Sequence, residues 1–169
     1  MTTAKQVMDV ARDQIGYTEK AKNNNKYGKA FGLNYDSWCA IFVWWCGDRA
    51  AEKHKGLNPI AKNASAAYIQ EETVRRGGKW ILKKTTKAKE KKAILPKLKE
   101  GDIISFDFGK KDAWRDHNGF VESVKGDTII TIEGNTQPQE GSAKYDGVHR
   151  RKRKYTEMCS VVRPRYTKK

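Results

Sequence analysis

The apolar run at residues 38–51, WCAIFVWWCGDRAA, limits most strongly what this chain can fold into. Its central part, AIFVWWC, is far shorter than the roughly 20 apolar residues that cross a bilayer. A helix over residues 38–51 would be hydrophobic on most of its sides, and such a helix is stable when other elements surround it. We therefore expect a central buried helix in a single domain covering residues 1–169, a length that suffices for one core.

The other elements divide between helices in the first half and strands in the second. Apolar residues at helical spacing predict helices over 3–15 and 64–76, and glycines follow both segments. Segments rich in β-branched residues predict strands at 102–108, 117–124, 127–133 and 159–165, with a fifth around 147–153. A KGD turn at 125–127 predicts a hairpin between the second and third of these strands. This order predicts an α+β fold, with N-terminal helices packed on a C-terminal antiparallel sheet.

The formal charge of +15 is concentrated in a few segments. Residues 79–92 hold seven lysines against one glutamate, and residues 149–154 have the sequence HRRKRK. The C-terminal tail adds Arg163, Arg165, Lys168 and Lys169. A field of this size attracts polyanions such as nucleic acid, anionic lipid or the acidic polymers of a bacterial wall. A solvated surface without a partner explains any single run equally well, and the role of the basic insertion 83–92 stays open.

Signals for targeting and crosslinking are absent from the sequence. The N-terminal residues MTTAKQVMDVARDQ have no apolar segment after the lysine, so we expect no secretory signal peptide. Three cysteines, an odd number, argue against a disulfide framework and favour synthesis in a reducing cytosol. We expect a monomer without a membrane span.

Cys39 stands at the predicted start of the central helix. The free N–H groups and the dipole of a helix N-terminus lower the pKa of a thiol, and the thiolate is the reactive form of cysteine. Cys46 lies two turns further along the same helix and Cys159 lies in a predicted strand, so we expect both to be packing residues. Position therefore favours Cys39 as a nucleophile, with burial as a small apolar side chain as the alternative.

A histidine and a carboxylate are predicted to meet at one edge of the sheet. His117 begins the strand HNGFVESV, from which its ring can project toward a helix end, and Gly119 on the same face leaves room there. Glu133 ends the next strand, and the hairpin returns it to the edge where His117 begins. A carboxylate at this place can accept the imidazole N–H and fix its tautomer. Asn135 is a further polar group within reach, and each residue alone also fits a structural role.

The order of cysteine at a helix start, histidine at a strand start and acid at the next strand end is that of papain-like chemistry. The segments SWCAIFVWWC, LKEGDIISF, DHNGFVESV and TIEGN also resemble the signature segments of the CHAP family, the cysteine- and histidine-dependent amidohydrolases/peptidases. The resemblance covers roughly residues 5–165 and implies a papain-like CHAP fold. It implies Cys39 as nucleophile, His117 as base, Glu133 as the group that orients the base, and Asn135 as a fourth polar member.

One feature of some phage members of this family is missing. Those members carry an aspartate-rich calcium loop before the cysteine, whereas the stretch here, KYGKAFGLNYD, offers Asp36 as its one plausible oxygen ligand. We therefore expect no metal site of that kind and no cofactor. Asp36 is expected to cap the central helix instead.

The resemblance implies a peptidoglycan hydrolase of the phage endolysin type, which acts at the bacterial wall after release from the cytoplasm. Members of the family are N-acetylmuramoyl-L-alanine amidases or endopeptidases of the stem or cross-bridge, and the sequence does not separate the two. Trp38 and Trp114 flank the nucleophile and the base, so they are candidate walls of a substrate groove, with core packing as the alternative. The basic surface is expected to hold the enzyme on anionic wall polymers without a separate wall-binding domain.

Two other functions fit part of the sequence. A basic nucleic-acid-binding module would explain the charge, but it leaves the order of Cys39, His117 and Glu133 unexplained and lacks a recognisable binding signature. A cysteine protease that acts on proteins would share the chemistry and differ in its groove.

Overall fold

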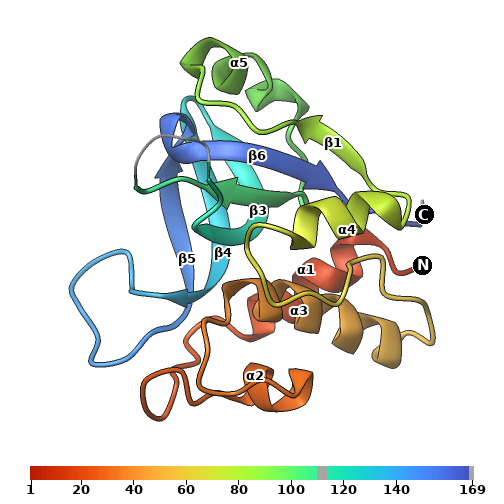
Figure 1. Cartoon of the computed structure of the whole chain (residues 1–169), viewed down its shortest axis with the longest axis vertical. Coiled ribbons are helices and arrows are strands. Elements are labelled where there is room, and N and C mark those ends of the chain that lie inside the picture. The colour runs from red at the N-terminus through yellow and green to blue at the C-terminus, as the bar shows by residue number, and fades with distance from the viewer. Residues whose placement is uncertain (110–113, 168–169) are drawn as a thin grey trace.

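The computed structural model describes residues 1–109 and 114–167, so Lys168 and Lys169 of the basic tail lie outside the described residues. Within this part of the chain, helices come first and a six-stranded sheet follows (Figure 1). The helices are α1 (Ala4–Asp13), α2 (Lys26–Phe31), α3 (Cys39–Lys53), α4 (Ile69–Arg75) and α5 (Ala88–Ala93), with 3-10 turns η1 (Leu95–Lys97) and η2 (Tyr155–Glu157). The strands are β1 (Lys79–Leu82), β2 (Ile103–Phe106), β3 (His117–Lys125), β4 (Thr128–Thr136), β5 (Gly147–Lys154) and β6 (Met158–Arg163). The predicted α+β class is confirmed.

Helix α3 is the central helix that the apolar run predicts. It contacts α1 and α2 as well as strands β3 and β4, and its residues 39–44 are all buried. Helix α1 begins with a capping box, in which the side chains of Thr3 and Gln6 each accept a hydrogen bond from the other residue's backbone N–H. These packed helices hold the first turn of α3 against the sheet.

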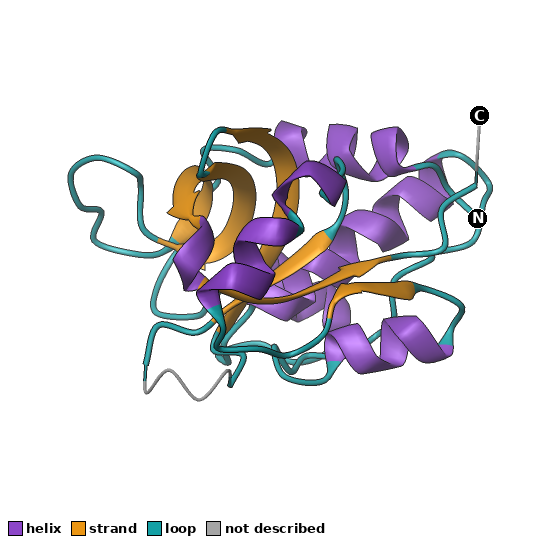
Figure 2. Ribbon diagram, turned by 90° about the horizontal axis from the view of Figure 1, so that it is seen from above, coloured by secondary structure: helices purple, strands orange, loops and turns teal. Residues whose placement is uncertain are grey.

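The sheet has the strand order β1-β6-β2-β3-β4-β5, and all neighbouring strands are antiparallel. Figure 2 shows that it is strongly twisted and curls at one end. Strands β3 and β4 form the predicted hairpin, with Lys125 opposite Thr128 across the turn. In the pair β2–β3, Phe106 lies opposite His117 and Ile103 lies opposite Phe120. The start of β3 therefore lies at the C-terminal end of β2.

Two helices and one strand of the structure were not predicted, and one predicted helix starts five residues later than expected. Helix α2 lies in a stretch that was expected to be a loop, and it is capped by Asn25, whose side chain accepts from the N–H of Gly28 at 2.8 Å. The basic segment 79–92 contains β1 and most of α5. Helix α4 begins at Ile69 rather than at residue 64, because the side chain of Asn63 accepts from the N–H of Ser65 and holds a turn there.

The described residues form two hydrophobic clusters. The larger cluster joins the helical half to the sheet through side chains such as Trp38, Phe42 and Phe120. The second includes Phe106 and Val121 of the sheet together with Ile94 and Leu95, which follow α5 directly. The basic insertion therefore leads into the apolar residues that cover the second cluster. No helix in residues 1–109 or 114–167 has the length and apolar character needed to cross a membrane.

Candidate active site

Cys39 is the first residue of α3, and its sulfur lies at the N-terminal end of the helix. Among the described residues, no side chain caps this end, where Trp38 is the N-cap residue. The prediction that Asp36 caps the helix is wrong, because its carboxylate accepts from the backbone N–H of Ser37 at 2.7 Å, before the helix begins. The N–H groups of the first turn thus remain available to an anion.

The thiol of Cys39 is stabilised as an anion by His117. Burial opposes ionisation of this sulfur, but a hydrogen bond and the charge of His117, followed by the backbone N–H groups of Asn118 and Ala40, lower the pKa of Cys39. Its side chain keeps a small exposed surface, since Cys39 is 4% exposed. The structure thus places a thiolate-forming cysteine at the surface end of a buried helix.

The other two cysteines have the opposite environment. Burial raises the pKa of Cys46 well above its usual range and raises that of Cys159 to about 11. Both are fully shielded from solvent, with 0% exposure. Their surroundings keep them protonated, as expected for packing residues.

His117 lies between the thiol and the carboxylate of Glu133. Its Nε2 is 2.9 Å from Oε2 of Glu133, which leaves Nδ1 as the nitrogen available to Cys39. Burial lowers the pKa of the imidazole, but the hydrogen bonds to Cys39 and Glu133 outweigh burial and raise the pKa of His117 to about 9. These opposite shifts favour a thiolate and imidazolium pair near neutral pH.

Glu133 is completely buried and remains ionised because it is surrounded by donors. Arg153 donates to it through Nε at 2.9 Å and Nη2 at 2.6 Å, and the hydroxyl of Thr131 donates at 2.6 Å. Burial raises the pKa of this carboxyl, but hydrogen bonds from Arg153 and His117 overcome burial and lower the pKa of Glu133 to about 2. The carboxylate is therefore a fixed negative charge behind the imidazole.

Arg153 contacts the candidate site through Glu133, and the sequence analysis missed it. It belongs to the basic run HRRKRK, yet it is 8% exposed, and its guanidinium lies 5.1 Å and 4.7 Å from the ring centroids of Phe106 and Phe108. Strand β5 alternates, so that Lys152 and Lys154 are exposed while Arg153 points inward to Glu133. Because side chains alternate along a strand, the sequence indicates that every second residue of this run points inward. The run contains no apolar residue, however, so the sequence does not show which of the two sets is the buried one.

Asn118 is a second residue that the sequence analysis did not single out. Its Oδ1 lies 3.9 Å from Sγ of Cys39, and its Nδ2 donates to the carbonyl of Ala66 at 3.0 Å and to Oγ of Ser105 at 2.9 Å. It thereby connects the segment before α4 to Cys39. Its position directly after His117 was the signal in the sequence.

Gly119 allows the carboxylate to approach the sheet closely. A Cβ atom at this position would lie 2.6 Å from Cγ of Glu133 and 2.9 Å from the carbonyl oxygen of Ile132. The space that was expected for backbone or substrate is therefore occupied by the side chain of Glu133. A side chain at residue 119 would push that carboxylate away from His117.

Trp38 does not line a groove on the surface, which corrects its prediction as a substrate wall. It is 0% exposed, its indole N–H donates to Glu19 at 2.8 Å, and its ring stacks on Tyr27 at 5.1 Å between centroids. These contacts instead hold the backbone directly before Cys39 in place. Trp114, in contrast, is 49% exposed three residues before His117, and Lys84 lies 5.6 Å from its ring centroid.

Asn135 has an unusual backbone and an unsatisfied side chain. Its φ of 57° lies in the left-handed region, which asparagine tolerates better than most residues. In the described part of the chain, its buried Oδ1 has no hydrogen-bond partner and no hydrogen bond joins it to His117. The structure thus places Asn135 two residues after Glu133 on β4, outside the row of Cys39, His117 and Glu133.

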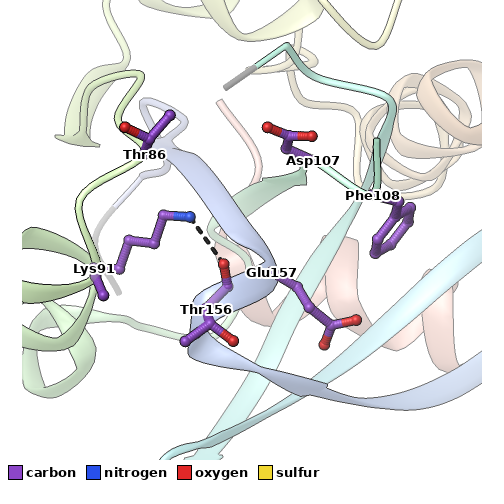
Figure 3. A pocket seen from close by; sticks show the side chains of 7 residues that line it. Thr86, Lys91, Asp107, Phe108, Thr156 and Glu157 are labelled. Atoms are coloured by element: carbon purple, nitrogen blue, oxygen red, sulfur yellow. Dashed lines mark hydrogen bonds between the residues drawn. The ribbon is translucent and has the colours of Figure 1, made fainter. Parts of the chain in front are cut away.

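A cavity of about 420 Å³ is lined on one side by Phe108, and Figure 3 shows the side chains that surround it. Phe108 is shared between this cavity and the catalytic row, because it lines the cavity and its ring centroid lies 6.0 Å from that of His117. Lys91 donates to the carbonyl of Thr156 at 2.8 Å across the cavity wall, and the carboxylates of Asp107 and Glu157 belong to the same lining. The lining of this cavity therefore combines charged and polar side chains with two apolar ones, Ala88 and Phe108.

The arrangement defines a class of site: a thiolate at a helix N-terminus, an imidazole that can carry its proton, and a buried carboxylate that orients the imidazole. This is the geometry of nucleophilic attack by cysteine on an acyl group. In residues 1–109 and 114–167, no three His, Cys, Asp or Glu side chains gather closely enough to hold a metal ion.

Comparison with protein families identifies the chain. The profile of the CHAP domain matches residues 26–135, which include Cys39, His117, Glu133 and Asn135. The chain therefore belongs to the CHAP domain family. Comparison with curated proteins gives no match.

Solved structures share the fold. The wild-type endolysin LysIME-EF1 superposes with a TM-score of 0.59 at 15% identity, over 98% of this chain and 66% of that chain. Ly7917 gives a TM-score of 0.54 at 15% identity, over 96% of this chain and 62% of that chain. A structure described as Ly7917 with the hydrolyzing product of MDP gives 0.53 at 14% identity, over 96% and 63%. The chain thus spans less than two thirds of the length of these proteins.

Proposed function

We propose that the chain is a peptidoglycan hydrolase that cleaves an amide bond of the bacterial wall with Cys39 as nucleophile. The observation that carries the proposal is the buried row of three residues, in which Cys39 interacts with His117 and His117 interacts with Glu133. Membership of the CHAP domain family and the likeness in fold to a named endolysin support it. The structure whose description includes a hydrolyzing product of MDP supports the choice of substrate.

In the proposed mechanism, His117 holds the thiol proton and the Cys39 thiolate attacks the amide carbonyl. The N–H of Cys39 at the start of α3 stabilises the developing oxyanion, a contribution of about 3 kcal/mol. The imidazolium then protonates the leaving amine, which breaks the C–N bond and leaves a thioester. Water attacks the thioester with His117 as general base, and the carboxylate product and free thiol are released.

Three features around the row are proposed to bind substrate. The exposed ring of Trp114 and the ring of Phe108 provide apolar surface near His117. The cavity beyond Phe108 has room for part of a stem peptide. Asn135 is proposed as the fourth polar member of the site: its buried Oδ1, which has no partner among the described residues, accepts an N–H group of the substrate once the side chain turns toward it.

The bond that is cut is either that of an N-acetylmuramoyl-L-alanine amidase or that of a stem or cross-bridge endopeptidase. The test follows the turbidity of purified Gram-positive walls with the wild type, Cys39→Ala and the matched control Cys159→Ala. We expect clearing by the wild type and the control, and none by Cys39→Ala. Mass spectrometry of the fragments then identifies the bond, since new N-terminal L-alanine indicates an amidase and new glycine or D-alanine ends indicate an endopeptidase.

Equal clearing by Cys39→Ala would remove this cysteine from the mechanism. Failure of the wild type on walls of several compositions would overturn the proposed function. Cleavage of unfolded proteins without wall lysis would favour a protease, and a salt-sensitive complex with duplex DNA without lysis would favour a nucleic-acid-binding module.

A further inference from the structure

A second cavity of about 420 Å³ lies far from the catalytic row along the sheet. It is lined by Lys99 and Glu100 before β2, together with the first residue of α1, Gly77 after α4, the first residue of β1 and the C-terminal segment. Phe106, at the other end of β2, lies opposite His117. Strand β2 thus separates this cavity from the catalytic site. Figure 1 shows both chain ends near α1 and α4, which is the side of the molecule where the cavity lies. A ligand there would not compete with the reaction.

Two of the charged residues that line this second cavity, Glu100 and Arg163, are paired within the protein. Glu100 is paired with Arg12, and Arg163 donates from Nε and Nη2 to the buried carboxylate of Asp102 at 2.7 Å each. Both of these lining charges are therefore compensated within the protein.

Three further cations line the same cavity. Lys79, Lys99 and Arg165 are exposed, and among the described residues their side chains form no ion pair and no hydrogen bond. Three cations that converge on one hollow at a protein surface raise the local concentration of anions. A ligand with several negative oxygens fits this lining, because it can contact all three groups together.

We propose that Lys79, Lys99 and Arg165 form a binding site for the phosphodiester groups of an anionic wall polymer. This inference rests on the proposed function, which brings the protein to the wall. The site holds the chain on the polymer while the opposite end of β2 presents the catalytic row to peptidoglycan. The proposal therefore attributes polymer binding to three defined side chains, and not to a diffuse attraction by the net charge of +15.

The lining favours a wall polymer over nucleic acid. Single-stranded nucleic acids bind by stacking their bases on exposed aromatic rings. Of the ten residues that line the cavity, Tyr166 alone is aromatic, and its hydroxyl donates to the carbonyl of Gly101 at 2.7 Å. Duplex DNA is recognised by an element that enters a groove, whereas these cations surround a hollow.

The test measures binding with Cys39→Ala, so that it does not depend on hydrolysis. A purified glycerol phosphate polymer is titrated by NMR against this protein and against the same protein with Lys79→Gln, Lys99→Gln and Arg165→Gln. The control carries Lys53→Gln, Lys89→Gln and Lys125→Gln, which removes the same charge from exposed side chains in α3, α5 and β3. Circular dichroism and thermal unfolding establish that both triple variants are folded.

We expect the cavity variant to bind the polymer at least tenfold more weakly than the control, and the largest amide shifts to occur at Gly77 and Gly101. Binding should weaken with salt, because the Debye length falls from about 10 Å at 0.1 M to about 3 Å at 1 M. Equal weakening of both variants would overturn the site in favour of a diffuse field. Duplex DNA that binds more tightly than the polymer and loses affinity in the cavity variant would assign the site to nucleic acid instead.

Discussion

Replacement of Arg153 tests whether the buried carboxylate of the site depends on this one cation. Arg153→Met removes the two hydrogen bonds to Glu133 while it keeps an unbranched apolar side chain against Phe106 and Phe108. Arg153→Lys keeps the charge but loses the planar fork that contacts both oxygens. Lys152→Met is the matched control, because it removes the same charge from the neighbouring exposed side chain.

The expected size of the effect follows from the pKa of Glu133. This pKa falls from 4.5 to about 2, and one pKa unit is worth about 1.4 kcal/mol, so the ionised form is stabilised by roughly 3 kcal/mol. Removal of one partner from a buried ion pair costs about 3 to 5 kcal/mol. We expect a loss of about 3 kcal/mol for Arg153→Met at pH 7, a smaller loss for Arg153→Lys, and a change within about 0.5 kcal/mol for Lys152→Met.

The dependence on pH separates this interaction from simple packing. A carboxyl whose pKa is lowered in the folded state contributes stability above its unfolded pKa, and this contribution is lost as pH falls through the folded pKa. For Glu133 the window extends from about 4.5 down to about 2. The difference between the wild type and Arg153→Met should therefore narrow as pH is lowered from 5 toward 3.

Urea unfolding, followed by tryptophan fluorescence at pH 7, 5, 4 and 3, measures the difference. Wall lysis at pH 7 provides a second readout, in which Arg153→Lys should recover part of the activity that Arg153→Met loses. Equal stability of Arg153→Met and Lys152→Met at pH 7 would refute the assigned role. A penalty for Arg153→Met that stays constant from pH 5 to 3 would show that it comes from lost packing.

The remaining predictions concern the reactive groups and the backbone around them. Iodoacetamide at pH 6 should alkylate Cys39 and leave Cys159 unmodified, as mass spectrometry of the peptides would show; modification of Cys159 first would contradict the opposite pKa shifts. Activity should decline above pH 9 as the imidazolium with a pKa of about 9 loses its proton, and a decline already near pH 7 in kcat/KM would contradict this assignment. Gly119→Ala should lower stability by about 1 to 3 kcal/mol and reduce lysis, whereas Gly109→Ala, whose Cβ would meet its nearest neighbour at 3.5 Å, should be tolerated. Asn135→Gly should keep the positive φ and the stability while it lowers activity, and full activity of that variant would remove the side chain from the site.

The elements that were predicted correctly are those with a strong hydrophobic period. Helix α3 and strands β3 and β4 each combine an apolar pattern with a clear turn or breaker at one end. Helix α2, strand β1 and helix α5 lie in polar or basic segments, where tertiary contacts rather than pattern decide the conformation. Strand β1 forms because its pairing with β6 places Trp80 opposite Val162 and buries Leu82.

The pairing of His117 with Glu133 was accessible from the sequence because the topology of one hairpin brings these two residues together. A hairpin with a short turn must return the end of its second strand to the start of its first, which places Glu133 beside His117. Proximity to Cys39 in the sequence does not show which way a side chain points: Trp38 was expected to line a substrate groove, but it is buried. Its burial depends on Tyr27, a residue of the unpredicted helix α2.

The basic residues belong to two populations that a charge count cannot separate. Several buried or half-buried arginines bind carboxylates inside the fold, as Arg153 binds Glu133 and Arg163 binds Asp102, because a planar fork satisfies two oxygens at once. The ion pairs of lysine within the described residues, such as that of Lys92 with Asp127, join exposed partners and contribute little to stability. Loss of an arginine that binds a buried carboxylate should therefore lower the free energy of unfolding, whereas loss of an exposed lysine should change how the protein responds to salt and polyanions. One run of positive charge in the sequence can therefore supply both internal ion pairs and exposed surface charge. In β5 the alternation of the strand determines which side chain points inward, as Arg153 does, and which points to solvent, as Lys152 and Lys154 do.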